Sequence, residues 1–190
     1  MLNKLYIPKT SIYRKLANSL TIFRLCVALP ILLLLSNGYN ELAWFLFISG
    51  GISDLLDGWM ARKAQDGANI YGAQLDPFAD KIILLSPFLW LVHQNVLQPW
   101  AIWIIISREL FISGWRSSQK GGGPASNVGK IKTFTQFTSI SLLIFPKNWG
   151  SNYFISLANQ IGIVFFWISF VFALISAFKY LFPQSDYHQN

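Results

Sequence analysis

The chain has few charged residues, few acidic residues and only one cysteine. Charged side chains make up 12% of its 190 residues, and only eight residues are acidic. Hydrophobic side chains make up 53%, and the mean hydropathy is +0.42. This composition excludes an ordinary soluble domain and is typical of an integral membrane protein. The lone Cys26 excludes an intramolecular disulfide.

The net charge of +7 is high for so apolar a chain. In a soluble protein such a charge would indicate nucleic-acid binding, but no soluble basic domain is left once the apolar runs are assigned to the membrane. We therefore expect no nucleic-acid partner. In a membrane protein the same charge sets orientation, or binds anionic lipids and anionic substrates.

Six apolar runs predict six transmembrane helices in an all-α integral membrane fold. They lie at roughly 18–36, 41–64, 72–93, 98–117, 128–146 and 156–181. Residues 1–17 carry four basic residues among apolar ones and predict a short amphipathic segment on the membrane surface. No cleavage site follows the first run, so we expect that run to remain as a signal-anchor. Residues 18–182 then form a single membrane domain, and residues 183–190 form a polar tail.

The distribution of Lys and Arg predicts the orientation of these spans. With both chain ends on one side of the membrane, the loops near 37–40, 94–97 and 147–155 lie on the other side. The only basic residue in these loops is Lys147. The other basic residues lie on the opposite side or at its membrane boundary. The positive-inside rule places both termini at the cytoplasmic face of the cell membrane.

Four carboxylates occur within one short stretch, at the end of the second predicted span and the start of the third. Asp54 and Asp57 are spaced i,i+3, and Asp76 and Asp80 are spaced i,i+4. Each pair therefore shares one face of a helix. Two such helices side by side would form a pocket lined by four carboxylates.

Carboxylates at membrane depth need a polar cavity and a counter-charge, because each costs roughly 2.5–3.5 kcal/mol on insertion scales. Two divalent cations would supply that charge. The stretch contains no Cys or His, so Mg²⁺ or Mn²⁺ fits better than Zn²⁺. Two such ions suit displacement at phosphorus.

The residues around the carboxylates fit a nucleotide site. Gly58 and Ala61 keep their helix surface thin, and Arg62 could clamp a phosphate. The alternative is that the carboxylates simply pair with Lys63 and Lys81 at the membrane surface.

The stretch resembles the signature of the CDP-alcohol phosphatidyltransferases, which reads Asp-x-x-Asp-Gly-x-x-Ala-Arg, a short spacer, and Gly-x-x-x-Asp-x-x-x-Asp. All its fixed positions are present, as Asp54, Asp57, Gly58, Ala61, Arg62, Gly72, Asp76 and Asp80. The resemblance implies a six-span membrane enzyme, often homodimeric, that transfers a phosphatidyl or related group from a CDP-alcohol to a hydroxyl and releases CMP.

The resemblance also implies roles for these residues. Asp54, Asp57 and Asp76 would hold two Mg²⁺ or Mn²⁺ ions. Asp80 would lie beside the second ion and act as general base on the acceptor hydroxyl. The CDP-diacylglycerol site would be lined by Gly58, Ala61, Arg62 and Gly72.

Two further patterns contain basic residues within predicted spans. The first span begins with Asn18-x-x-Thr21-x-x-Arg24, which indicates either a capped helix start with a snorkelling arginine or a functional site. The family resemblance favours the functional site. The fourth span contains Arg108-Glu109, either a functional pair or a self-neutralising pair that locks two helices.

The glycine-rich segment before Lys130 is not a phosphate-binding P-loop. Pro124 occupies the position of the required glycine, and Ile131 stands where Ser or Thr is needed. Lys130 and Lys132 instead lie near the start of the fifth span, where they could hold a phosphate.

These further patterns resemble the branch of the family that uses sn-glycerol 3-phosphate as the acceptor and forms phosphatidylglycerophosphate. The expected acceptor-phosphate residues are Arg108, Arg116, Lys130 and Lys132. One alternative is a different acceptor within the family: phosphatidylglycerol, as in cardiolipin synthases, inositol phosphate or serine. An alternative from another class is a divalent-cation transporter, whose carboxylates would lie near the membrane midplane.

Overall fold

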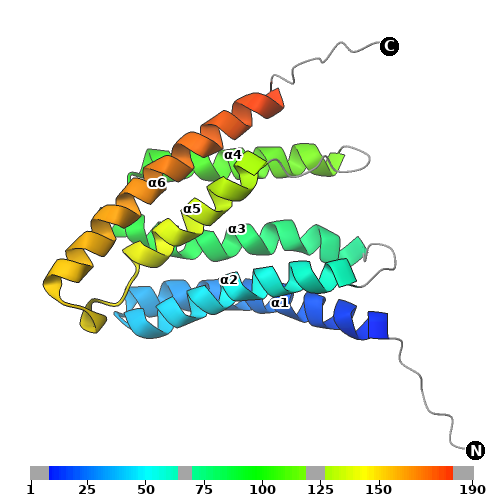
Figure 1. Cartoon of the computed structure of the whole chain (residues 1–190), viewed down its shortest axis with the longest axis horizontal. Helices are drawn as coiled ribbons and strands as arrows, with labels where there is room; N and C mark the ends of the chain where they lie inside the picture. The colour runs from blue at the N-terminus through cyan, green and yellow to red at the C-terminus, as the bar shows by residue number, and fades with distance from the viewer. Residues whose placement is uncertain (1–8, 64–69, 119–126, 182–190) are drawn as a thin grey trace, which may run out of the picture. The chain divides into compact units, whose positions relative to one another are not determined.

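The structure is a computed structural model that describes residues 9–63, 70–118 and 127–181, with side chains at 16, 18–56, 78–114, 129 and 131–178. These residues form six α-helices and no strand. The helices are α1 (Lys9–Ser36), α2 (Asn40–Lys63), α3 (Ile70–His93), α4 (Pro99–Ser118), α5 (Asn127–Leu143) and α6 (Asn152–Leu181) (Figure 1). The short 3₁₀ helix η1 (Lys147–Trp149) precedes α6. The prediction of an all-α fold is confirmed.

The helices follow the predicted spans closely, and the differences are at their ends. Helix α1 begins at Lys9, so the described part of the predicted surface segment is continuous with the first span. It ends where Gly38 adopts a φ of +82°, a conformation that glycine reaches without strain. Helix α5 ends at Leu143, three residues before Pro146, and α6 begins at Asn152. Residues 1–8 and the predicted tail 183–190 lie outside the described residues.

Two helical segments in the described part of the chain are long and apolar enough to cross a membrane. They are Asn18–Ser36, with a mean hydropathy of 2.1, and Asn152–Phe178, with a mean hydropathy of 2.5. A bilayer's hydrocarbon core requires about 20 apolar residues of helix. Together with the composition of the chain, these helices indicate a membrane protein.

The chain divides into two compact units, residues 1–90 and 91–190. In the first unit, α1 packs along α2. Ala28, Ile31 and Leu35 are buried at helical spacing on α1. The end of the Ile83 side chain of α3 lies against Gly50 of α2, in the place that a Cβ atom would occupy.

In the second unit, α5 packs along α6, and α4 also contacts α6. Ser139 Oγ donates a 2.7 Å hydrogen bond to the carbonyl oxygen of Gly162, across the α5–α6 contact. A Cβ atom at Gly162 would lie 2.9 Å from Cγ of Leu143, so this glycine permits the close approach of the two helices. The ring of Trp100 on α4 meets that of Trp167 on α6, with centroids 5.8 Å apart.

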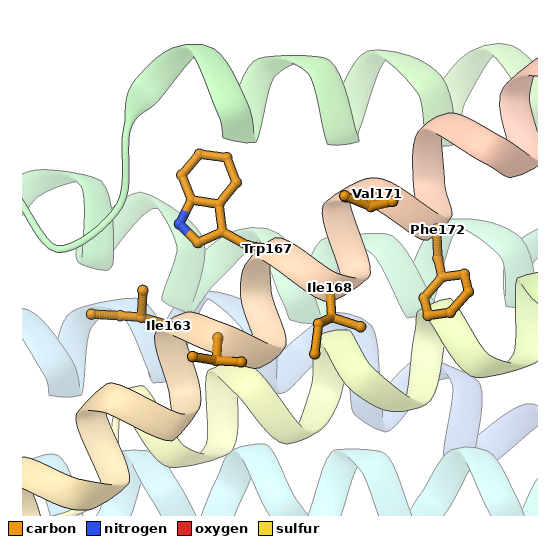
Figure 2. Close-up of a pocket in the computed structure, with 6 residues that line it drawn as sticks. Ile163, Trp167, Ile168, Val171 and Phe172 are labelled. Carbon is orange, nitrogen blue, oxygen red and sulfur yellow. The ribbon is translucent and has the colours of Figure 1, made fainter.

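One side of α6 presents an open apolar groove of about 480 Å³ (Figure 2). The described residues that line it all come from this helix: Ile163, Val164, Trp167, Ile168, Val171 and Phe172. Val164 and Val171 are more than half exposed. An exposed apolar helix face of this kind is typical of contact with lipid chains or with another protein. The groove therefore agrees with a location in the membrane.

Candidate active site

The first unit contains a cluster of charged side chains centred on Arg24. Its Nη1 donates to Oδ1 of Asp54 on α2 and to Oδ1 of Asp80 on α3. The Arg24 side chain is 1% exposed, whereas each carboxylate side chain is 46% exposed. The guanidinium is therefore buried among three helices, while both carboxylates remain accessible.

Arg24 reaches this position because it belongs to the core-facing side of α1. Thr21, Arg24, Ala28 and Ile31 follow helical spacing, and all four are 2% exposed or less. The side chain is thus directed into the unit and does not extend toward water. The alternative of a snorkelling arginine is wrong.

The two ends of the acidic motif converge on this arginine. Asp54 begins the first half of the motif and Asp80 ends the second, and the structure brings them together through one guanidinium. Both halves lie on helices, as their spacing predicts. The alternative in which the carboxylates pair with Lys63 and Lys81 did not include Arg24 as a partner. The remaining motif side chains lie outside the described residues: Asp57, Gly58, Ala61, Arg62, Gly72 and Asp76.

The second unit contains a cluster with the opposite charge balance, centred on Glu109 of α4. Its Oε1 accepts a 2.7 Å hydrogen bond from Nη1 of Arg108 and another from Nζ of Lys132 on α5. Arg108 Nη2 also donates to Ser176 Oγ on α6, at 2.6 Å. These contacts join all three helices of the unit.

The three charged side chains of this cluster are largely buried. Their exposed fractions are 10% for Arg108, 21% for Glu109 and 6% for Lys132. Two cations share one carboxylate among the described contacts. The predicted Arg108–Glu109 pair forms within α4, and the contacts with Lys132 and Ser176 join α4 to α5 and α6.

Arg108 retains an unused donor. Its Nε is buried, and no hydrogen-bond partner lies within the described part of the chain. A buried donor without a partner costs about 1–3 kcal/mol, so an oxygen of a bound anion would be favourable there. The side chains of Arg116 and Lys130, the other two predicted acceptor residues, lie outside the described residues.

Sequence reasoning did not identify Ser176 as part of this cluster. It lies in the apolar run Phe172-Ala-Leu-Ile-Ser176-Ala-Phe178, where a single serine is ordinary. Its only signal is burial, since it is 1% exposed on the helix that packs against α5.

Comparison with known families identifies the chain. Residues 14–175 match the family model of the CDP-alcohol phosphatidyltransferases. The chain belongs to this family. The match includes Arg24, both halves of the acidic motif and Lys132, and it ends one residue before Ser176. The resemblance of the acidic stretch to the signature of the CDP-alcohol phosphatidyltransferases is confirmed.

Several relatives of this CDP-alcohol phosphatidyltransferase have a specific name. The CDP-diacylglycerol–glycerol-3-phosphate 3-phosphatidyltransferase of Rickettsia typhi is 29% identical in an alignment of 174 positions that covers 88% of this chain and 95% of the relative. The Bacillus subtilis protein of the same name is 33% identical over 71% of this chain and 69% of its own. A probable phosphatidylglycerophosphate synthase of Mycobacterium tuberculosis is 36% identical over 69% of this chain and 66% of its own.

Proposed function

We propose that this chain transfers the phosphatidyl group of CDP-diacylglycerol to sn-glycerol 3-phosphate, giving phosphatidylglycerophosphate and CMP. The observation that carries the proposal is the similarity, over 88% of the chain, to an enzyme named for this reaction. The acidic motif supports the transfer itself, and the two cations at Glu109 in the second unit support a phosphorylated acceptor.

The proposed reaction needs a base and a leaving group. Asp80 accepts the proton of the acceptor hydroxyl, and the resulting oxygen attacks the phosphatidyl phosphorus. The bond from that phosphorus to the CMP oxygen breaks, and CMP departs. Arg24 supports this role because it holds the Asp80 carboxylate beside Asp54.

We assign two Mg²⁺ or Mn²⁺ ions to Asp54, Asp57, Asp76 and Asp80. The two described carboxylates fit such ions, because their oxygens come from different helices, meet at one cationic group and are half-exposed. When bound, the ions would neutralise the pyrophosphate and stabilise the charge on departing CMP. The nucleotide itself is assigned to Gly58, Ala61, Arg62 and Gly72.

The acceptor's phosphate is assigned to the basic residues of the second unit. The two cations at Glu109, and the Nε of Arg108, which has no partner among the described residues, support this assignment. Lys132 belongs to the same group, and Arg116 and Lys130 complete the proposed set.

We further propose that all six helices span the cell membrane, with both termini and the active site at the cytoplasmic face. The basic residues on that side and the exposed apolar face of α6 support this arrangement. A cytoplasmic site would let both water-soluble compounds, glycerol 3-phosphate and CMP, exchange with the cell. A homodimer is proposed on the resemblance to the family.

The test measures CMP release by purified protein with CDP-diacylglycerol and Mg²⁺, supplying glycerol 3-phosphate, phosphatidylglycerol, inositol phosphate and serine one at a time. We expect release with glycerol 3-phosphate alone, and none after EDTA treatment. Release with a different acceptor would retain the transfer chemistry and overturn the acceptor. No release with any acceptor, from protein that binds CDP-diacylglycerol, would overturn the proposed reaction.

A further inference from the structure

We propose that Glu109, an acidic residue, is a positioning residue of the acceptor-phosphate site. It holds Lys132 and the Nη1 group of Arg108, and so leaves the Nε–H of Arg108 to bind an oxygen of the phosphate. This inference rests on the proposed function, because it concerns the same site. It assigns separate tasks to residues that were expected only to supply positive charge.

The contacts of Arg108 show which of its nitrogen atoms lacks a described partner. A guanidinium has five N–H donors in a rigid planar fork. Nη1 donates to Glu109 and Nη2 donates to Ser176, so α4 and α6 fix the plane of the fork. Nε is buried without a partner in the described residues. An anion oxygen is the partner that this N–H lacks.

Lys132 has a different task. Its Nζ contacts the same carboxylate oxygen as Arg108, and its side chain is only 6% exposed. A lysine held in this way stabilises the carboxylate between two cations. It also ties α5 to α4, which keeps the Arg108 plane in place.

Glu109 lowers the repulsion between the two buried cations of the site when no substrate is bound. Two buried cations without an anion would repel each other and lose hydration. One shared carboxylate reduces the repulsion, and the Nε–H of Arg108 stays without a described partner. The site is therefore preorganised for a phosphate monoester, and little rearrangement is needed when it binds.

The experiment compares Glu109→Asp and Glu109→Gln with the native protein, in membranes or detergent. Measured quantities are kcat, KM for glycerol 3-phosphate, KM for CDP-diacylglycerol, and the inhibition constant of inorganic phosphate. Aspartate keeps the charge but is one methylene shorter, so it cannot hold both cations in place. Glutamine keeps the length but loses the charge. We expect each variant to raise KM for glycerol 3-phosphate and the phosphate inhibition constant about tenfold, with kcat and KM for CDP-diacylglycerol within about twofold.

A matched pair of serines tests the same geometry without altering charge. Ser176→Ala removes the partner of Arg108 Nη2, and we expect KM for glycerol 3-phosphate to rise about threefold. Ser169 lies two turns earlier on α6, is 1% exposed, and donates only to the Phe166 carbonyl of its own helix among the described contacts, at 2.7 Å. Ser169→Ala should leave both constants unchanged. This pair keeps the proposal testable if a Glu109 variant fails to fold.

Three results would overturn the proposal. A lower KM in Glu109→Gln would mean that the carboxylate only cancels charge. A loss of kcat with unchanged KM would place Glu109 in the chemical step. Equal effects of Ser176→Ala and Ser169→Ala would remove the role of the Arg108 plane. If the native protein uses another acceptor while the phosphate inhibition constants still change as expected, the proposed function fails and the positioning role stands.

Discussion

The two units of the molecule use the same arrangement of charges with opposite sign. In the first, two carboxylates from α2 and α3 share one buried arginine of α1. In the second, two cations from α4 and α5 share one glutamate of α4. Each central group ties its helices together.

The two groups differ in the sign that predominates among their described contacts. Two carboxylates meet one cation in the first, and two cations meet one carboxylate in the second. The second also has an N–H donor without a described partner, which favours an anion. A buried ion pair is weak evidence of stability, because the desolvation of the charges opposes their attraction. The donor without a described partner is better evidence of function, because it indicates the kind of ligand.

The largest expected effect comes from Asp80→Asn. The amide cannot accept the acceptor's proton, so turnover should fall by about 10³-fold while CDP-diacylglycerol binding is largely kept. CMP release and binding of the nucleotide lipid measure the two properties. Glu41→Gln, which changes an exposed carboxylate in the first turn of α2, is the control and should keep turnover. Near-normal turnover in Asp80→Asn would break the comparison, because the acidic group would then have no chemical role.

A smaller effect is expected from Arg24→Met, which keeps an apolar stem and removes the guanidinium. Without metal, we expect the free energy of unfolding to fall by about 2 kcal/mol. Removing one partner of a fully buried ion pair lowers it by more than this, but here both carboxylates are half-exposed. Mn²⁺ should then stabilise the variant more than the native protein, because in the variant the ion no longer competes with an arginine for the two carboxylates. Thermal unfolding with and without Mn²⁺ measures both effects, and Arg24→Lys is the matched control. An equal Mn²⁺ effect in both proteins would show that arginine and metal do not share these carboxylates.

The smallest expected effect is on stability, when one glycine in each unit is replaced by alanine. Gly162→Ala should destabilise the second unit by about 1 kcal/mol, because the new methyl meets Cγ of Leu143 at 2.9 Å and Cβ of Leu142 at 3.2 Å, close to the helix backbone. Gly50→Ala should be neutral or slightly stabilising. There the new methyl meets only the end of the flexible Ile83 side chain, and alanine favours helix by about 1 kcal/mol. Thermal unfolding of both variants tests the order, and a more damaging Gly50→Ala would reverse it.

The helices could be predicted from sequence because long apolar runs are interrupted by short polar segments. The acidic motif was equally clear, since Asp54 and Asp80 sit at fixed helical spacings from their neighbours. The sequence did not show that Arg24 is the partner of these carboxylates. Whether Arg24 faces lipid, water or the core depends on the packing of α1 against α2, which its own sequence does not specify. The contact of Lys132 with Glu109 joins residues 23 positions apart, and only the packed helices determine it.

The burial of Arg24 has a consequence for biosynthesis. Both carboxylates that it contacts in the described part of the chain come later, by 30 and 56 residues. As the chain emerges from the ribosome, α1 therefore enters the bilayer before these two carboxylates have been made. The apolar neighbours of Arg24 outweigh the roughly 2.5–3.5 kcal/mol insertion cost of its charge. Arg24 of α1 can form its contacts with Asp54 and Asp80 only after α2 and α3 have been synthesised and have packed against it.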